Sequence, residues 1–262
     1  MDLSIRLANI NIYIHSVYDL FNDNIKEYTV PDMKVPDIEI ISNKSLIDAE
    51  YERLQISNND IESLESVEMI LIQRLIAEML PNYNAFLLHG AAIAVNNETY
   101  IFSARSGTGK TTHIQHWLEK IDNACVVNGD KPYILINEKG AFACGTPWCG
   151  KEKMGTNTIQ PIRSIVFMER SIENRMEKVD FKTALPRLLE QTYHPVDAVQ
   201  MKKMLKLLLK LKNLVTFYIF YFDNFKEDVF QVSYNTLAQQ KSSNESMSDG
   251  EYVKTIHKQH RV

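Results

Sequence analysis

A glycine-rich turn between an apolar strand and an amphipathic helix is the feature that most constrains this chain. Residues Ala104–Thr112 read Ala-Arg-Ser-Gly-Thr-Gly-Lys-Thr-Thr. The β-favouring run Thr99–Ser103 precedes the turn, and Lys110–Lys120 follows it with apolar residues at helical spacing. A strand, such a turn and a helix in succession are typical of a phosphate-binding loop, and a chance glycine turn is the alternative.

Each residue type in the loop has a physical role toward a phosphate chain. Gly107 and Gly109 let the backbone turn so that successive N–H groups point at phosphate oxygens. Lys110 places a cation on the β- and γ-phosphates, and the Thr111 hydroxyl is a Mg²⁺ ligand. Ala104 stands where the general motif has its first glycine. We therefore expect ATP and Mg²⁺ to bind at Ser106, Gly107, Thr108, Gly109, Lys110, Thr111 and Thr112.

A carboxylate follows the next buried strand along the chain. Ala124–Val127 is apolar, and Asn128-Gly129-Asp130 comes directly after it. A carboxylate at that strand end can hold Mg²⁺ together with Thr111, or accept the proton of an incoming hydroxyl. The alternative is that Asn-Gly-Asp is only a turn, for which those residues are common.

A single histidine, His89, lies in the apolar segment Phe86–Val95 that leads toward the loop. A histidine in such a strand is often a hydrogen-bonded core residue. If it takes part in chemistry, its role is to orient or tune Asp130, because an imidazole beside a carboxylate biases the protonation of that carboxylate.

Three segments together resemble the HPr kinase/phosphorylase family: Leu88–Ala92, Ser106–Thr112 and Asn128–Pro132. The loop is also similar to that of ATP-dependent phosphoenolpyruvate carboxykinase. The matched block runs from about His89 to Arg170, roughly a third of the chain. The resemblance implies that the loop binds ATP, with Asp130 as the base toward a serine hydroxyl and His89 beside it.

The chain departs from that family in two places. The family carries two adjacent aspartates after the second strand, and Gly129 replaces one of them here. The family's Glu-Arg-Gly-Leu-Gly segment is also missing, and Gly145–Asn157 stands in its place. The protein substrate HPr is therefore not implied, and the acceptor stays open between serine in another peptide or protein and a small hydroxylated molecule.

The order of elements predicts an α/β fold with a mixed sheet, of the HPr-kinase/phosphoenolpyruvate-carboxykinase type. We expect a small strand-and-loop subregion over residues 1–58, a kinase-like domain over 59–238 and a mobile polar tail over 239–262. Residues 3–14 alternate as one strand. The apolar positions of Asp60–Leu80 predict a long helix, opened by Asn59 and closed by Pro81.

Several residues near the loop have two possible roles each. The segment Gly145–Asn157 has the composition of a flap over a substrate, in which Lys151 or Lys153 contacts phosphate and Trp148 closes over the base or acceptor; an ordinary surface loop is the alternative. Arg170 either neutralises charge in the transition state or makes a strand end soluble. Lys131 is expected in solvent, since alternation points it away from Asp130.

Composition excludes other classes of function. A formal net charge of −4 over 262 residues gives no basic stripe for nucleic acid. The longest apolar run, Leu214–Phe222, falls short of the ~18 residues that cross a bilayer. Three cysteines fit a reducing compartment, so we expect a cytoplasmic protein that does not act at a membrane.

These features predict an ATP-dependent phosphotransferase with an alcohol group as acceptor. Two alternatives remain. One is a phosphoenolpyruvate-carboxykinase-like enzyme acting on a small carboxylic acid. The other is a nucleotide-dependent switch or ATPase that has no phosphate acceptor. The sequence does not predict an oligomeric state.

Overall fold

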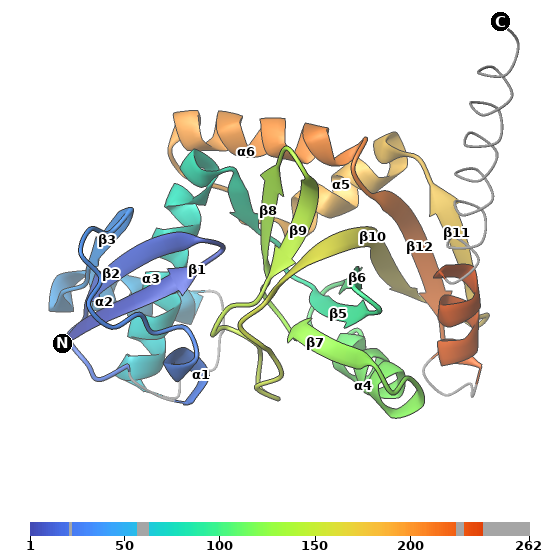
Figure 1. Cartoon of the computed structure of the whole chain (residues 1–262), viewed down its shortest axis with the longest axis horizontal. Coiled ribbons are helices and arrows are strands. Elements are labelled where there is room, and N and C mark those ends of the chain that lie inside the picture. The colour runs from blue at the N-terminus through green and yellow to red at the C-terminus, as the bar shows by residue number, and fades with distance from the viewer. Residues whose placement is uncertain (21–22, 57–62, 224–227, 238–262) are drawn as a thin grey trace, which may run out of the picture.

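The computed structural model describes residues 1–20, 23–56, 63–223 and 228–237. A three-stranded sheet near the N-terminus lies beside a nine-stranded mixed sheet, and helices cover both faces of the larger sheet (Figure 1). The expected α/β class, with a mixed sheet and a small N-terminal β-containing part, is confirmed. None of the described helices is both long enough and apolar enough to cross a membrane.

The N-terminal sheet contains β1 (Asp2–Leu7), β2 (Ile10–His15) and β3 (Ile38–Ile41). The prediction of one strand over residues 3–14 is wrong. Ala8 and Asn9 both have positive φ and form a two-residue turn, so β1 and β2 pair as an antiparallel hairpin. β3 then pairs parallel to β2. Two helices, α1 (Asp23–Lys26) and α2 (Lys44–Ile56), follow β2 and β3, and neither was predicted.

The helix α3 (Leu64–Met79) is shorter than the predicted Asp60–Leu80. Its N-cap is Ser63, whose hydroxyl accepts the backbone N–H of Ser66 at 3.2 Å, and not Asn59. Residues 57–62 lie outside the described part of the chain, as do the predicted boundary at 58/59 and the predicted tail 239–262. The helix continues into η1 (Leu80–Tyr83), with Pro81 near its start.

The side chain of Glu68 on α3 joins this helix to the N-terminal sheet. Its two carboxylate oxygens accept the backbone N–H groups of Val17 and Tyr18, at 2.7 and 2.8 Å. The same helix packs its apolar face against β1 and β2 and reaches Tyr133 of the central sheet. The N-terminal part therefore shares one apolar core with the rest of the molecule.

The central sheet has the order β4-β8-β9-β10-β6-β5-β7, with β12 paired to β10 and β11 paired to β12. Its strands are β4 (Ala85–Leu87), β5 (Ala91–Val95), β6 (Glu98–Ser103), β7 (Ala124–Asn128), β8 (Tyr133–Asn137), β9 (Gly140–Cys144), β10 (Ile159–Arg170), β11 (Arg175–Val179) and β12 (Thr216–Phe222). The second half of β10 lies between β6 and β12 and is parallel to both. Three parallel strands thus end at the same edge of the sheet.

Alternation along β10 distributes its side chains between two helical layers. Ile165 and Phe167 pack under α5 (Phe181–Gln191) and α6 (Ala198–Leu211). Val166 and Met168 belong to the core on the opposite face, with α4 (Lys110–Lys120) and the helical residues 229–237. Figure 1 shows α5 and α6 above the sheet and α4 below it.

Candidate functional site

The glycine-rich turn connects β6 to α4 as predicted. Gly107 and Gly109 have φ of +73° and +120°, a backbone region that residues with side chains rarely adopt. No side chain of the described residues caps α4, whose N-cap is Gly109. The N–H groups of its first turn therefore face the cavity in front of the loop with the positive end of the helix dipole.

Lys110 reaches back beneath this loop. Its side chain is buried, with 7% of the residue exposed, and its Nζ donates to the backbone oxygen of Ala104 at 2.9 Å. Nζ also lies 3.1 Å from Nε2 of His89. Burial lowers the pKa of the Lys110 ammonium, and the charge of Asp130 opposes that shift.

His89 lies where the predicted strand Phe86–Val95 is interrupted. The prediction of a single strand here is wrong, because β4 ends at Leu87 and β5 begins at Ala91. Between them, the Gly90 N–H donates to the Asp130 backbone oxygen at 2.8 Å. The break places His89 Nε2 3.3 Å from Asp130 Oδ1. Three side chains predicted from separate segments, Lys110, His89 and Asp130, therefore meet at one point.

The charge state of Asp130 follows from these neighbours. Burial alone would raise the pKa of its carboxyl, but the hydrogen bond with His89 and the charges of Lys131 and Lys110 hold that pKa below its ordinary value. Asp130 is therefore an ionised carboxylate at neutral pH. It can accept a hydrogen bond, a proton or a metal ion.

Gln191, at the end of α5, sets the orientation of the His89 ring. Its Oε1 lies 2.9 Å from His89 Nδ1. An amide oxygen only accepts, so Nδ1 carries a hydrogen. In the neutral ring, Nε2 then accepts from the Lys110 ammonium; in the protonated ring, Nε2–H donates to Asp130. Gln191 was not predicted, because nothing in the local pattern of α5 marks a residue 102 positions away from its partner.

Asn128 fixes the turn that presents Asp130. The buried side chain accepts the N–H groups of Asp130 and Lys131 through Oδ1, at 2.9 and 2.6 Å, and donates to the Thr146 hydroxyl at 3.0 Å. Asn128-Gly-Asp130 is thus a turn, and this turn positions the carboxylate. An asparagine that binds N–H groups two and three residues ahead is the signal that sequence reasoning could have used.

Steric crowding explains why position 129 is a glycine and not one of the two aspartates of the HPr kinase/phosphorylase family. A Cβ at this position would lie 2.9 Å from the backbone oxygen of Cys149 and 3.0 Å from that of Met154. The segment 145–157 crosses directly over the turn, and the Gly129 N–H donates to Met154 at 2.8 Å. No side chain fits between the turn and this segment.

The loop and this overlying segment enclose a cavity of about 430 Å³. Its lining combines loop, turn and overlying residues: Ser106, Gly107, Gly109, Lys110, Thr111, Thr112, Gly129, Asp130, Gly150, Lys151 and Glu152. Of the predicted binding residues, Thr108 is not part of this lining and faces a neighbouring cavity. Of the two lysines considered in the overlying segment, Lys151 lines the cavity and Lys153 does not.

Trp148 and Lys131 differ from expectation. Trp148 stacks on Tyr133 with ring centroids 6.3 Å apart, and its Nε1 donates to the backbone oxygen of Met69 at 3.1 Å, so it anchors the overlying segment to α3. Trp148 does not line the cavity. Lys131 is half-buried, and its Nζ donates to Gln73 Oε1 at 3.2 Å, so the expected solvent exposure is wrong.

Arg170, at the end of β10, contacts the glycine-rich loop directly. Its Nη2 donates to the backbone oxygen of Gly107 at 3.0 Å. This places a guanidinium beside the loop, where the sequence left open a role in neutralising anionic charge. The fold and this site together define a mixed-sheet α/β protein with a cavity beside a glycine-rich loop and a Lys–His–Asp cluster that contributes Lys110 and Asp130 to the cavity lining.

Comparison with known proteins gives a distant likeness to solved structures. No family model matches the sequence, and no curated protein matches it. Among solved structures, the Hpr(Ser) kinase/phosphatase from Coxiella burnetii is similar over 67% of this chain and 99% of that chain, at 7% identity and a TM-score of 0.37. A likeness at that level carries no argument about activity, which is argued below from the geometry of the site.

Proposed function

We propose that this protein is an ATP-dependent phosphotransferase that phosphorylates a hydroxyl group, either of serine in a peptide or protein or of a small molecule. The observation that carries the proposal is the meeting of Lys110, His89 and Asp130 at the cavity in front of the phosphate loop. A phosphate loop alone binds nucleotides in many kinds of protein. An ionised carboxylate beside the loop lysine is what a hydroxyl acceptor requires.

Each residue of the site would have a separate role in the reaction. The backbone N–H groups of Ser106–Thr112 and the N-terminus of α4 would hold the phosphates, and Lys110 would neutralise the oxygens nearest the transferred group. Asp130 would accept the proton of the acceptor hydroxyl as its oxygen bonds to phosphorus. His89, held by Gln191, would keep Asp130 ionised and oriented. When bound, ATP supplies the phosphoryl group.

The residues present also fit a magnesium ion. Mg²⁺ in nucleotide sites is usually held by one or two protein oxygens together with phosphate oxygens and water. Thr111 and Asp130 line the same cavity and offer a hydroxyl and a carboxylate. They would hold the ion, whose charge would add to that of Lys110.

The compartment in which the reaction occurs is also a proposal. All three cysteines are free, with Cys144 and Cys149 buried and Cys125 exposed. Free thiols support the reducing cytoplasm that the sequence predicts.

The decisive experiment compares wild-type protein with Asp130→Asn. Each would be incubated with γ-labelled ATP, Mg²⁺ and a panel of serine peptides and small alcohols. We expect wild type to produce labelled acceptor, and the variant to lose about 10²–10⁴ in rate while still binding nucleotide, because asparagine accepts no proton.

Lys139→Gln is the matched control, since Lys139 lies in the turn between β8 and β9 and does not line the cavity. Equal turnover by Asp130→Asn and wild type would remove Asp130 from the mechanism. Release of free phosphate by wild type, with every acceptor unlabelled, would favour a switch or ATPase over a kinase.

A further inference from the structure

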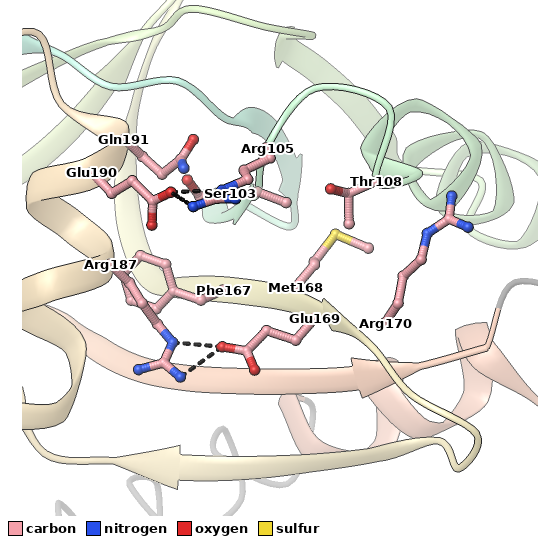
Figure 2. Close-up of a pocket in the computed structure, with 11 residues that line it drawn as sticks. Ser103, Arg105, Thr108, Phe167, Met168, Glu169, Arg170, Arg187, Glu190 and Gln191 are labelled. Atoms are coloured by element: carbon pink, nitrogen blue, oxygen red, sulfur yellow. Dashed lines mark hydrogen bonds and ion pairs between the residues drawn. The ribbon is translucent and has the colours of Figure 1, made fainter.

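A second cavity lies on the other side of the phosphate loop. It has a volume of about 330 Å³ and lies between the ends of β6 and β10 and the last turn of α5 (Figure 2). Figure 2 shows Arg105, Glu190 and Gln191 on one side of this basin and Arg187 with Glu169 on the opposite side. Apart from Gln191, which orients His89, none of these side chains has a role in the proposed binding of ATP.

The two cavities share the phosphate loop as a wall but take different residues from it. Ala104, Arg105 and Thr108 face the second cavity, whereas Gly109–Thr112 face the first. The loop lysine marks the end of a bound triphosphate from which phosphate is transferred, because its ammonium contacts the β- and γ-phosphates. Its Nζ is bonded to the backbone oxygen of Ala104. The second cavity therefore adjoins the transfer end of the site.

Gln191 connects this cavity to the reacting groups. Its side chain lines the cavity, and its Oε1 contacts His89, which in turn lies 3.3 Å from Asp130. Ser103, on the same wall, donates its hydroxyl to the His89 backbone oxygen at 2.7 Å. A molecule in this cavity would contact Gln191, and His89 would lie between Gln191 and the proposed base.

Two ion pairs hold arginines at the rim of the cavity. Arg105 Nε and Nη2 lie 2.7 and 2.6 Å from Glu190 Oε1. Arg187 Nε and Nη2 lie at the same distances from Glu169 Oε1. In both pairs a single edge of the guanidinium faces the glutamate, and Nη1 of Arg105 takes no part in that contact. Phe167 and Met168 form the apolar part of the lining.

The lining carries more positive than negative charge. Arg170 is the third arginine, and no carboxylate of the described residues forms an ion pair with it, while the glutamates number two. The side chains of Arg105 and Glu190 are 78% and 47% exposed, and ion pairs at such exposure are weak enough to exchange partners. Guanidinium groups recognise planar carboxylates through paired hydrogen bonds.

We propose that this second cavity binds the phosphate acceptor, and that the acceptor is a small hydroxylated carboxylic acid whose carboxylate contacts Arg187 and Arg105. The inference rests on the proposed kinase function and adds the chemical class of its substrate. The acceptor's carboxylate is held at the arginine rim and its hydroxyl points past Gln191 toward Asp130. The hydroxyl proton goes to Asp130, its oxygen bonds to the γ-phosphorus, and the bond from that phosphorus to ADP breaks.

The test is a calorimetric titration of the protein after saturation with Mg²⁺ and a non-hydrolysable ATP analogue. Two probes, L-serine and D-glycerate, carry both a hydroxyl and a carboxylate. The other two, ethanolamine and glycerol, carry a hydroxyl but no carboxylate. We expect the two carboxylates to bind and the two alcohols to bind at least tenfold more weakly. Arg187→Gln should weaken carboxylate binding at least tenfold.

Arg175→Gln is the matched control, because Arg175 pairs with Glu177 on β11 and is not part of the cavity. It should leave every affinity unchanged. The inference is overturned if no carboxylate binds, if the alcohols bind equally well, or if Arg187→Gln behaves as Arg175→Gln does. Normal binding of the ATP analogue in those cases leaves the kinase proposal standing, whereas failure of the analogue to bind overturns both.

Discussion

Two histidines near the phosphate loop have opposite surroundings. The His89 ring contacts three polar groups: Gln191, the Lys110 ammonium and the Asp130 carboxylate. His113, one turn into α4, is fully buried among the rings of Phe102, Trp117 and Phe220. Burial lowers the pKa of His113 to about 3, so this ring stays neutral.

The difference shows how α4 serves two purposes. Its C-terminal half is fixed by aromatic packing: Trp117 contacts Phe230 and Tyr234, and its Nε1 lies 3.1 Å from His113 Nε2 and 3.3 Å from Ser233 Oγ. This packing allows the N-terminus of the helix to present uncapped N–H groups and a buried lysine to a cavity. Stability and chemistry are thus placed at opposite ends of one helix.

The largest effect on this arrangement is expected from Trp117→Ala. Trp117 is among the largest fully buried side chains, and its removal should cost about 3–5 kcal/mol of unfolding free energy. Denaturant unfolding would measure the loss. Leu118→Ala, at a position 36% exposed on the same helix, should cost far less. Equal losses at the two positions would contradict the anchoring role of the aromatic packing.

The next effect is expected at Gln191, which touches His89 but neither the loop nor Asp130. Gln191→Leu removes the acceptor for His89 Nδ1, so the ring loses its orientation and kcat should fall about tenfold, equivalent to about 1.4 kcal/mol. Gln191→Glu restores an acceptor and adds negative charge. This variant should recover kcat and move the pH profile of kcat to higher pH, since a carboxylate favours the protonated imidazole.

Identical pH profiles for wild type and Gln191→Glu would show that Gln191 has only a structural role. Unchanged nucleotide affinity in both variants serves as the check that the phosphate loop is intact.

A smaller effect is expected from His113→Phe. The replacement keeps the aromatic packing, leaves Ser233 as acceptor for Trp117 Nε1 and removes the buried Nδ1, which has no partner in the described part of the chain. At pH 8 the unfolding free energy should change by less than about 1.5 kcal/mol. Below the ordinary histidine pKa of 6.5 the variant should gain stability relative to wild type, because the unfolded wild-type chain takes up a proton at His113 that the folded chain does not. A loss of nucleotide binding would mean that His113 belongs to the site after all.

The smallest effect is the pH dependence of stability through Asp130. Its pKa is lower in the folded protein than in the unfolded chain, so its contribution to stability is complete above the unfolded value of about 4. That contribution is lost as pH falls through the folded pKa. The difference in unfolding free energy between wild type and Asp130→Asn should therefore be constant from pH 5 to 7 and shrink below about pH 4. A difference that grows on acidification would contradict the sign of the shift.

Local signals were sufficient to predict the strand, the glycine-rich turn and the helix that follows it. Lys110–Lys120 was predicted with the observed bounds, and the predicted strand Thr99–Ser103 differs from β6 only by starting one residue later. These elements carry both a strong periodicity and a glycine turn. By contrast β11 (Arg175–Val179), with its charged and half-exposed residues, carries no apolar alternation and was missed.

The parts that sequence reasoning missed depend on contacts between distant segments. The break at His89 is caused by backbone bonds to Pro132, Asp130 and Gln191, none of which a local pattern reveals. The composition of its loop left open whether Trp148 closes over a substrate or belongs to an ordinary surface loop, and its indole in fact contacts Tyr133 and α3. Composition indicated a segment that covers the turn, and only packing decides which of its side chains face the cavity.

The central claim is that the phosphate loop binds a nucleotide through Lys110. A calorimetric titration with Mg²⁺–ATP of wild type and of Lys110→Ala tests it most directly, with Lys120→Ala on the same helix as control. The account predicts saturable heat for wild type and Lys120→Ala, and none for a Lys110→Ala variant that unfolds at the same denaturant concentration. No heat with wild type, or equal affinity in Lys110→Ala, would contradict it.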